Sequence, residues 1–250
     1  MLRAVMRGRV FQSLITHPPQ IINCEICGGH RIQVRTDPSP RIGSRCLFCR
    51  GTAHHRGTFA VLRQLFGQDL GGLRGKSVYE LSAHGALFHA LKRYAARLDF
   101  RFTYSELFDA PLGSVRDGVR CENVERLTFP DRQFDLITST GMMEHVENDI
   151  AGYREIARVL KPGGFYVFTV PYHENCGTII RARRLEDGSI EHLKPPEYHS
   201  DPWNPDGVFT WRNYGPDIVL TMASAGLRAE VRKVRVSGLE HEMPIVIGTI

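Results

Sequence analysis

The chain has 250 residues, of which 42% are hydrophobic and 24% are charged, and its formal net charge is +5. This composition is ample for a buried core and is that of an ordinary globular protein. The longest apolar runs, such as residues 165–170, are far shorter than the ~20 residues of a membrane-spanning helix. The first twenty residues lack a sustained apolar stretch, so we expect no signal peptide, no membrane partner and a cytoplasmic location.

The charge is unevenly distributed along the chain. Residues 1–76 hold 12 Lys and Arg against 3 Asp and Glu, whereas residues 77–250 hold 20 against 24. A basic segment of this kind fits a polyanionic partner such as RNA, but more often it is a solvated face. Both interpretations stay open.

Four cysteines form two pairs that predict a metal site. The sequences CEIC at 24–27 and CLFC at 46–49 are separated by 18 residues, which is the spacing of a zinc ribbon. Four thiolates complete a tetrahedral zinc shell with no position open to water, so this zinc is expected to be structural. Structural iron and chance spacing are the alternatives. The expected ligands are Cys24, Cys27, Cys46 and Cys49, whereas His30, His54 and His55 are expected at the surface.

A helix is expected after this module. Phe59, Leu62, Leu65 and Phe66 recur at helical spacing, and GGLRG at 71–75 breaks the pattern. We therefore expect a zinc-ribbon module over 1–57, a linking helix over 58–75 and a second domain over 76–250.

From residue 77 onward the periodicity alternates between strand and helix, which is typical of an α/β sheet with crossover helices. Helices are expected at 85–98, 150–160 and 216–226. Strands are expected at 77–82, 99–107, 132–140, 164–172, 228–236 and 243–250.

The stretch YELSAHGAL (79–87) lies at the first strand-to-helix turn of this domain, where parallel sheets present backbone N–H groups to a ligand. It holds a single glycine, Gly85. Glu106 follows 21 residues later at the end of the second strand, where an acid can accept hydrogen bonds from ribose hydroxyls. A tight turn and a surface glutamate would explain this pair equally well.

Residues 121–171 carry a more specific pattern, because LTFPDRQFD leads into a strand, MEHV follows it and EIARVLKPGG precedes the next strand. This run resembles the class I S-adenosylmethionine-dependent methyltransferases of the ubiquinone/menaquinone-methylase-like group, and the resemblance covers residues 77–250. It implies a Rossmann-like seven-stranded sheet with a reversed β-hairpin at the C-terminus, in an α/β fold. It also implies S-adenosylmethionine as cofactor and methyl transfer as reaction.

The resemblance further assigns the cofactor contacts. They are the glycine-loop positions Glu80, Ser82 and Gly85, the ribose acid Glu106, the adenine pair Asn123 and Val124, and Thr140 and Gly141 near the methionine end. Two departures from the family pattern stand out. Ser82, His84 and Ala86 occupy glycine positions, and Asn123 replaces an aspartate. Small residues can suffice in this loop because the cofactor has no pyrophosphate, and an asparagine NH₂ can donate to an adenine ring nitrogen.

Methyl transfer needs a base only when the nucleophile carries a proton. The candidate catalytic residues in the loops after the strands are His145, His173, His199 and Asp201. The insertion over 174–206 is long for a connection and is predicted to be a lid, with a hairpin turn at EDGS (186–189). Its EYHSDPWNP segment resembles a stretch of bacterial methyltransferases linked to glycan modification, in which Trp203 would stack on a sugar.

We therefore expect a methyltransferase acting on a small-molecule or glycan hydroxyl. One alternative is an RNA methyltransferase with a zinc ribbon that contacts RNA, although residues 1–76 hold four Phe but no Tyr or Trp for base stacking. The other alternative is a non-catalytic, zinc-dependent interaction protein on a degenerate scaffold. The sequence does not predict an oligomeric state.

Overall fold

The computed structural model describes residues 18–35, 43–199 and 206–250. It divides into two compact units, each described by itself below. Unit 1 comprises residues 1–103 and 232–245, and unit 2 comprises residues 104–231 and 246–250. Two residues that the sequence singles out, Asp201 and Trp203, lie outside the described residues.

Unit 1 begins with a small antiparallel sheet in the order β1-β2-β3. Its strands are β1 (Gln20–Asn23), β2 (His30–Arg35) and β3 (Ser44–Cys46). Each cysteine pair lies in the turn that follows β1 or β3. The turns are closed by hydrogen bonds from Gly28 N to Cys24 O and from Arg50 N to Cys46 O, both of 2.8 Å.

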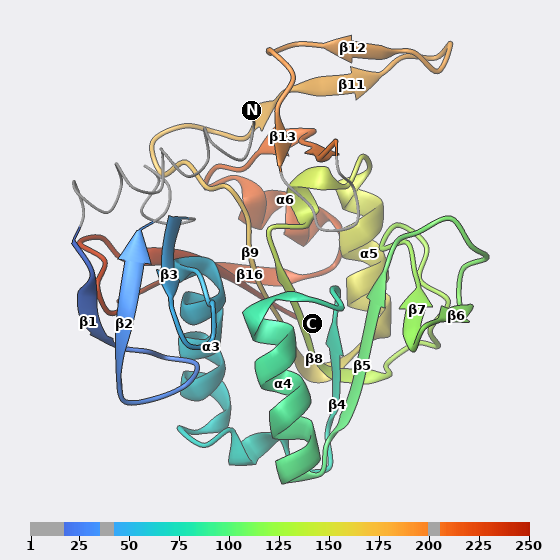
Figure 1. Cartoon of the computed structure of the whole chain (residues 1–250). Coiled ribbons are helices and arrows are strands. Elements are labelled where there is room, and N and C mark those ends of the chain that lie inside the picture. The colour runs from blue at the N-terminus through green and yellow to red at the C-terminus, as the bar shows by residue number, and fades with distance from the viewer. Residues whose placement is uncertain (1–17, 36–42, 200–205) are drawn as a thin grey trace. The chain divides into compact units, whose positions relative to one another are not determined.

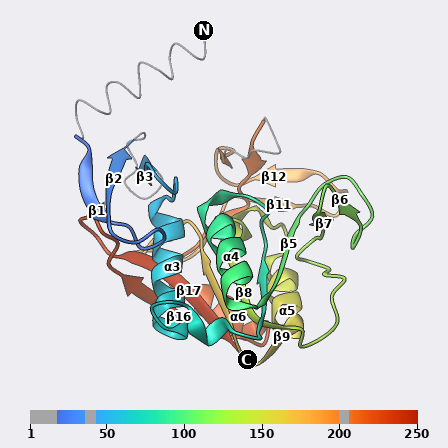
Figure 2. The same ribbon diagram turned by 60° about the horizontal axis from the view of Figure 1, so that its bottom comes forward.

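Unit 1 continues with two helices that lie side by side, α3 (Ala53–Phe66) and α4 (Gly85–Leu98), as both views show (Figures 1 and 2). The turn η1 (Gly71–Leu73) and strand β4 (Ser77–Glu80) connect them. The helix expected from residue 58 begins at Ala53 instead, because a capping box at Thr52 and His55 closes its N-terminus. The predicted apolar face is buried in part: Phe59, Leu62 and Phe66 are buried.

A buried arginine ties three segments of unit 1 together. The Arg56 guanidinium is fully buried, and its Nε donates to Glu25 Oε2 over 2.6 Å. Its Nη1 donates to Gln33 Oε1 and its Nη2 to the carbonyl oxygen of Ser237, each over 2.5 Å. Ser237 N donates in turn to Glu25 Oε1 over 2.6 Å. The ribbon, helix α3 and the segment near residue 237 therefore share one polar network.

Unit 2 contains the parallel strand pair β8 (Phe134–Thr140) and β9 (Leu160–Thr169). Helix α5 (Asp149–Val159) connects these strands, and its buried face places the Tyr153 ring 6.0 Å from the Phe168 ring. Residues 246–249 of β17 (Met243–Thr249) pair antiparallel with β9, which is the reversed C-terminal strand expected from the sequence. The α/β prediction is therefore confirmed.

Unit 2 contains a second group of paired strands. The end of β5 (Arg101–Glu106) pairs parallel with β7 (Val119–Cys121), and β6 (Val115–Arg116) pairs antiparallel with β7. Strand β16 spans Arg228–Val234, and the strand orders within unit 2 are β17-β9-β8 and β5-β7-β6. Strand β6 was not expected from the sequence; it forms because Asp117 and Gly118 take positive φ and make a tight hairpin.

The insertion after β9, together with the segment that follows it, forms three small antiparallel pairs within unit 2. They are β10 (Ile179–Ile180) with β15 (Arg212–Asn213), β11 (Ala182–Arg184) with β12 (Ile190–His192), and β13 (Tyr198–His199) with β14 (Val208–Phe209). The predicted turn at 186–189 is confirmed, since Leu185 N donates to Ser189 O across it. Figure 1 shows β11 and β12 as a projecting hairpin.

Helix α6 (Ile218–Ser224) follows this insertion and leads into β16. In the part of the chain that the structure describes, no helix is long and apolar enough to cross a membrane.

Candidate functional site

The four paired cysteines of unit 1 converge on one point. Cys24 Sγ lies 3.6 Å from Cys49 Sγ, and Cys27 Sγ lies 3.8 Å from Cys46 Sγ. All four sulfur atoms lie within 4.8 Å of one another. Tetrahedral zinc with Zn–S bonds of ~2.3 Å requires S–S distances of about 3.8 Å, whereas a disulfide needs ~2.05 Å. The four residues therefore fit a closed zinc site and do not form disulfides.

Neighbouring thiols of this cluster share a proton, so the hydrogen bond that lowers the pKa of Cys24 raises the pKa of Cys49. The hydrogen bond from the Cys49 thiol lowers the pKa of Cys24 to about 4, and the thiolate is the form that binds metal. Of the nearby histidines, His30 is exposed, as expected. His55 is not a surface residue: it is half-buried and caps α3, and burial lowers its pKa to about 3.

The stretch 79–87 forms a tight turn in unit 1 between β4 and α4. Glu80 is buried at the end of β4, and the Ser82 hydroxyl lies 3.1 Å from His84 Nδ1 and accepts from His84 N. Gly85 opens α4 with φ +84°, a conformation that L side chains rarely adopt. A Cβ atom at this position would lie 3.0 Å from His55 Nε2. The single glycine stands where the backbone requires one.

The other expected cofactor residues lie in unit 2. Glu106 is half-buried at the end of β5, and Val124 is buried. Asn123 Oδ1 accepts from Glu125 N over 2.9 Å, which leaves the Asn123 NH₂ as the donor of that side chain. Thr140 Oγ1, at the end of β8, is buried and has no hydrogen-bond partner among the described residues. Gly141 follows with φ +61°.

Two of the predicted catalytic histidines meet in unit 2. The rings of His145, in η2 (Met143–His145), and His199, in β13, have centroids 4.9 Å apart in an edge-to-face arrangement. His173 is exposed and is not part of this cluster; its backbone N donates to Tyr214 O. The fourth candidate, Asp201, lies outside the described residues.

A buried carboxylate that the sequence reasoning missed joins the two histidines. Glu144 Oε1 lies 3.8 Å from His145 Nε2 and 3.6 Å from His199 Nδ1. Hydrogen bonding to Glu144, and then to Glu197, raises the pKa of His199. The sequence offered one indication of Glu144: it directly precedes the candidate base His145 in the MEHV motif.

The segment after the insertion fixes the loop that carries these residues. Trp211 N donates to Glu144 O over 2.9 Å, and His145 Nδ1 lies 2.8 Å from Phe209 O. The buried Arg212 guanidinium donates to Val146 O and to Glu147 O. Backbone carbonyls and one arginine therefore hold the Glu144–His145 loop in place.

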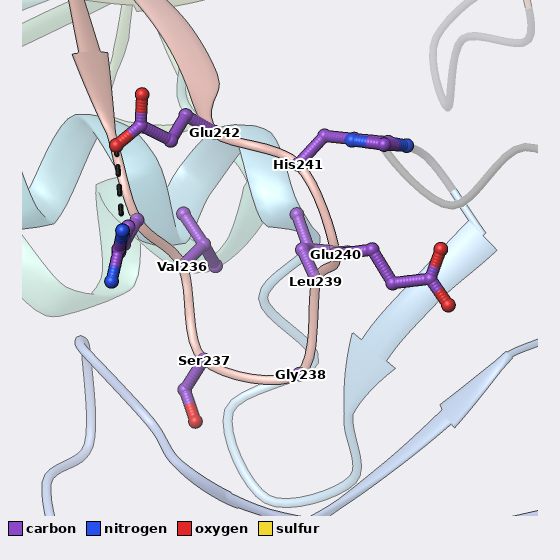
Figure 3. Close-up of a pocket in the computed structure, with 8 residues that line it drawn as sticks. Val236, Ser237, Gly238, Leu239, Glu240, His241 and Glu242 are labelled. Atoms are coloured by element: carbon purple, nitrogen blue, oxygen red, sulfur yellow. Dashed lines mark ion pairs between the residues drawn. The ribbon is translucent and has the colours of Figure 1, made fainter.

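Unit 1 contains a pocket lined by residues 235–242, shown in Figure 3. Two of the lining residues form an ion pair, with 3.6 Å between Arg235 Nε and Glu242 Oε1. None of the predicted cofactor, catalytic or metal residues lines this pocket, so it is not the candidate site.

Residues 69–168 match the family described as "Methyltransferase domain". A ubiquinone biosynthesis O-methyltransferase of Shewanella pealeana is 29% identical over 112 residues, which cover 41% of this chain and 46% of that protein. A ubiquinone/menaquinone biosynthesis C-methyltransferase of Stenotrophomonas maltophilia is 50% identical over 48 residues, 19% of each chain. The chain thus spans less than half the length of these relatives.

Solved structures give a weaker likeness. An S-adenosylmethionine-dependent methyltransferase from Mesorhizobium loti is 16% identical and has a TM-score of 0.48, with coverage of 77% of this chain and 96% of that chain. The sequence match over residues 69–168 shows that this part of the chain is similar to the methyltransferase-domain family.

Proposed function

We propose that this chain, which carries a class I S-adenosylmethionine-dependent methyltransferase domain, transfers a methyl group to a hydroxyl group of a small molecule or glycan. The observation that carries methyl transfer is the family match over residues 69–168. In the reaction the methyl–sulfonium bond breaks as the methyl–oxygen bond forms. The hydroxyl proton leaves to a base, and S-adenosylhomocysteine is released.

For the cofactor in unit 1, we propose contacts from the turn at Glu80, Ser82 and Gly85. The N-terminus of α4 begins there, and helix N-termini present backbone N–H donors. This geometry is compatible with a working loop even though it holds only one glycine.

In unit 2 we propose Glu106 as the acceptor for ribose hydroxyls and Asn123 as the donor to adenine. Val124 would pack on the adenine ring, and Thr140 and Gly141 would meet the methionine portion. The buried Thr140 hydroxyl supports this role because it has no partner among the described residues, and buried hydroxyls usually have one.

For a hydroxyl acceptor we propose His145 as the base. Its Nδ1 lies 2.8 Å from the carbonyl oxygen of Phe209, which can only accept, so Nδ1 carries the proton in the neutral ring. The lone pair is then on Nε2, which faces Glu144 and His199. His199 suits this role less, because its raised pKa keeps it protonated to a higher pH.

We propose a structural zinc ion at Cys24, Cys27, Cys46 and Cys49. The sulfur geometry supports it, and a closed four-thiolate shell leaves no position for a substrate. When bound, the metal supplies folding energy to the ribbon and no step of the reaction.

Calorimetric titration with S-adenosylmethionine and S-adenosylhomocysteine tests the proposal. We expect binding by the wild-type chain, a loss of at least tenfold in affinity in Glu106→Ala, and no change in Glu186→Gln, which alters an exposed acid of the hairpin turn. Absence of binding by the wild type would refute the enzyme. Equal binding by Glu106→Ala would remove Glu106 from the site.

The acceptor is tested separately with radiolabelled S-adenosylmethionine. Label transferred to alcohols or glycans supports the proposal, and label transferred only to RNA refutes the small-molecule or glycan acceptor in favour of the RNA alternative. Cofactor binding with a loss of transfer in His145→Gln is the result expected of a base.

A further inference from the structure

Three side chains of unit 2 form a compact group of potential metal ligands: Glu144, His145 and His199. One ligand atom from each lies within 4.8 Å of the other two. The distances from Glu144 Oε1 are 3.8 Å to His145 Nε2 and 3.6 Å to His199 Nδ1. Two histidines and one carboxylate are a donor set used by both zinc and non-haem iron sites.

The far nitrogen of each histidine is held by an acceptor, as is usual for histidines that bind metal ions. His145 Nδ1 lies 2.8 Å from Phe209 O, and His199 Nε2 lies 3.0 Å from Glu197 Oε1. Glu197 itself pairs with Arg181 over 2.9 Å. These contacts direct the lone pairs of His145 Nε2 and His199 Nδ1 toward Glu144.

The environment of the Glu144 carboxylate independently supports a bound cation. Its side chain is 2% exposed, and its Oε2 atom has no hydrogen-bond partner within the described residues. A buried carboxylate oxygen without a partner is costly. A protonated His199 would compensate Oε1 but would leave Oε2 without a partner, whereas a cation bound by both carboxylate oxygens would satisfy Oε2 as well.

Two of the three distances between ligand atoms fit an ion after a small contraction. Ligand bonds of ~2.0–2.2 Å in tetrahedral geometry place neighbouring ligand atoms about 3.4 Å apart. The observed 3.6 and 3.8 Å exceed this by a few tenths of an ångström. Rotation of the His199 side chain can supply that movement, because this side chain is only half-buried.

We propose that Glu144, His145 and His199 bind a divalent transition-metal ion, with Zn²⁺ as the test ion. Three protein ligands leave a coordination position open, and an oxygen ligand such as water or a hydroxyl group would occupy it. The inference goes beyond methyl transfer and does not depend on it. One lone pair on His145 Nε2 serves either a metal or a proton, so the metal-loaded form cannot use His145 as a base.

Metal content measures the site directly on the full chain. The protein is stripped with a chelator, reloaded with Zn²⁺ or Co²⁺, desalted and analysed by mass spectrometry of the metal. We expect the wild type to hold one more ion per chain than Glu144→Gln or His199→Ala. The matched control is His192→Ala, which removes an exposed histidine of β12 that also contacts the Phe209 ring, and it should equal the wild type.

Co²⁺ absorption separates this ion from one at the four cysteines. Thiolate ligands give a sulfur-to-cobalt charge-transfer band that imidazole and carboxylate ligands lack. The spectrum of the wild type minus that of His199→Ala should therefore contain ligand-field bands without the thiolate band. Circular dichroism of each variant checks that the chain is folded.

Two results would overturn the proposal. One is a wild-type chain that, fully reloaded, holds a single ion whose entire spectrum is that of a thiolate site. The other is equal metal content in the wild type, Glu144→Gln and His199→Ala. Neither result bears on methyl transfer, which is tested by cofactor binding and labelled acceptors.

Discussion

Replacing Arg56 by methionine should destabilise unit 1 strongly. The side chain is fully buried, and its guanidinium donates to Glu25, Gln33 and the Ser237 carbonyl. Removing one partner of a buried ion pair usually costs 3–5 kcal/mol, because the other partner is left buried and uncompensated. Glu25 is 14% exposed and keeps its bond from Ser237 N, and methionine refills the space of the stem. We therefore expect the lower end, about 3 kcal/mol.

Urea unfolding of the zinc-loaded chain measures this loss. With a slope of about 2 kcal/mol per molar urea, 3 kcal/mol lowers the midpoint by about 1.5 M. Far-UV circular dichroism reports both units, whereas the fluorescence of Trp211, which lies in unit 2, reports that unit. Release of zinc to a chromogenic chelator adds a probe of unit 1.

The matched control is Arg93→Met, which makes the same change at an exposed position of α4. It should shift the midpoint by less than about 0.3 M, since exposed substitutions usually cost under 0.5 kcal/mol. A loss of unfolding free energy below about 1 kcal/mol in Arg56→Met, or equal losses in the two variants, would refute the inference that the Arg56 network stabilises unit 1.

Three further predictions concern stability. Gly85→Ala should cost more than Gly188→Ala in thermal unfolding, because both glycines have φ near +84° but only a Cβ at Gly85 would meet another group, His55 Nε2 at 3.0 Å; equal losses would contradict the clash. The folded-state pKa of His55, about 3, lies below its ordinary value of 6.5. The stability that His55 contributes is therefore present above pH 6.5 and is lost as the pH falls toward 3, by at most about 2 kcal/mol between pH 7 and 5. His55→Asn should flatten that part of the pH profile of urea unfolding. An unchanged profile would refute the role of His55. Arg158 donates to Phe129 O, Leu127 O, Asp131 and Glu155. Arg158→Met should therefore lower the free energy of unfolding, followed by tryptophan fluorescence, by about 1–2 kcal/mol. Arg154→Met, at an exposed position of the same helix, should cause no loss.

The features that could be predicted from the sequence are those encoded over short distances along the chain. Two CxxC turns each position two thiolates locally, so their spacing alone indicated a four-cysteine cluster, and the structure brings these sulfur atoms together. Alternating strand and helix periods likewise predicted the α/β fold. The short strand β6 was missed because two residues carry no periodicity, and only the positive φ values of Asp117 and Gly118 create it.

The Glu144 cluster could be predicted only in part. The sequence singled out His145 and His199 separately, but they are 54 positions apart and meet because β13 pairs with β14. His145 is oriented by the backbone carbonyl of Phe209. A contact to the backbone cannot be predicted from residue types. Glu144 escaped notice for a related reason: an acid in a polar motif looks solvated, and only the folded chain shows that it is buried.

The Arg56 network also bears on the order in which the molecule can be completed during synthesis. The ribbon is synthesised well before residue 237, yet the bonds from the ribbon and from Arg56 to Ser237 and Gly238 join residues separated by 181 to 214 positions. Long separations of this kind slow folding, because much of the chain must exist before the contact can form. Until residues 237 and 238 have been synthesised, the ribbon lacks these bonds, and the Arg56 guanidinium lacks the Ser237 carbonyl as an acceptor. We expect the zinc ion proposed at the four cysteines to keep the ribbon folded until these contacts form.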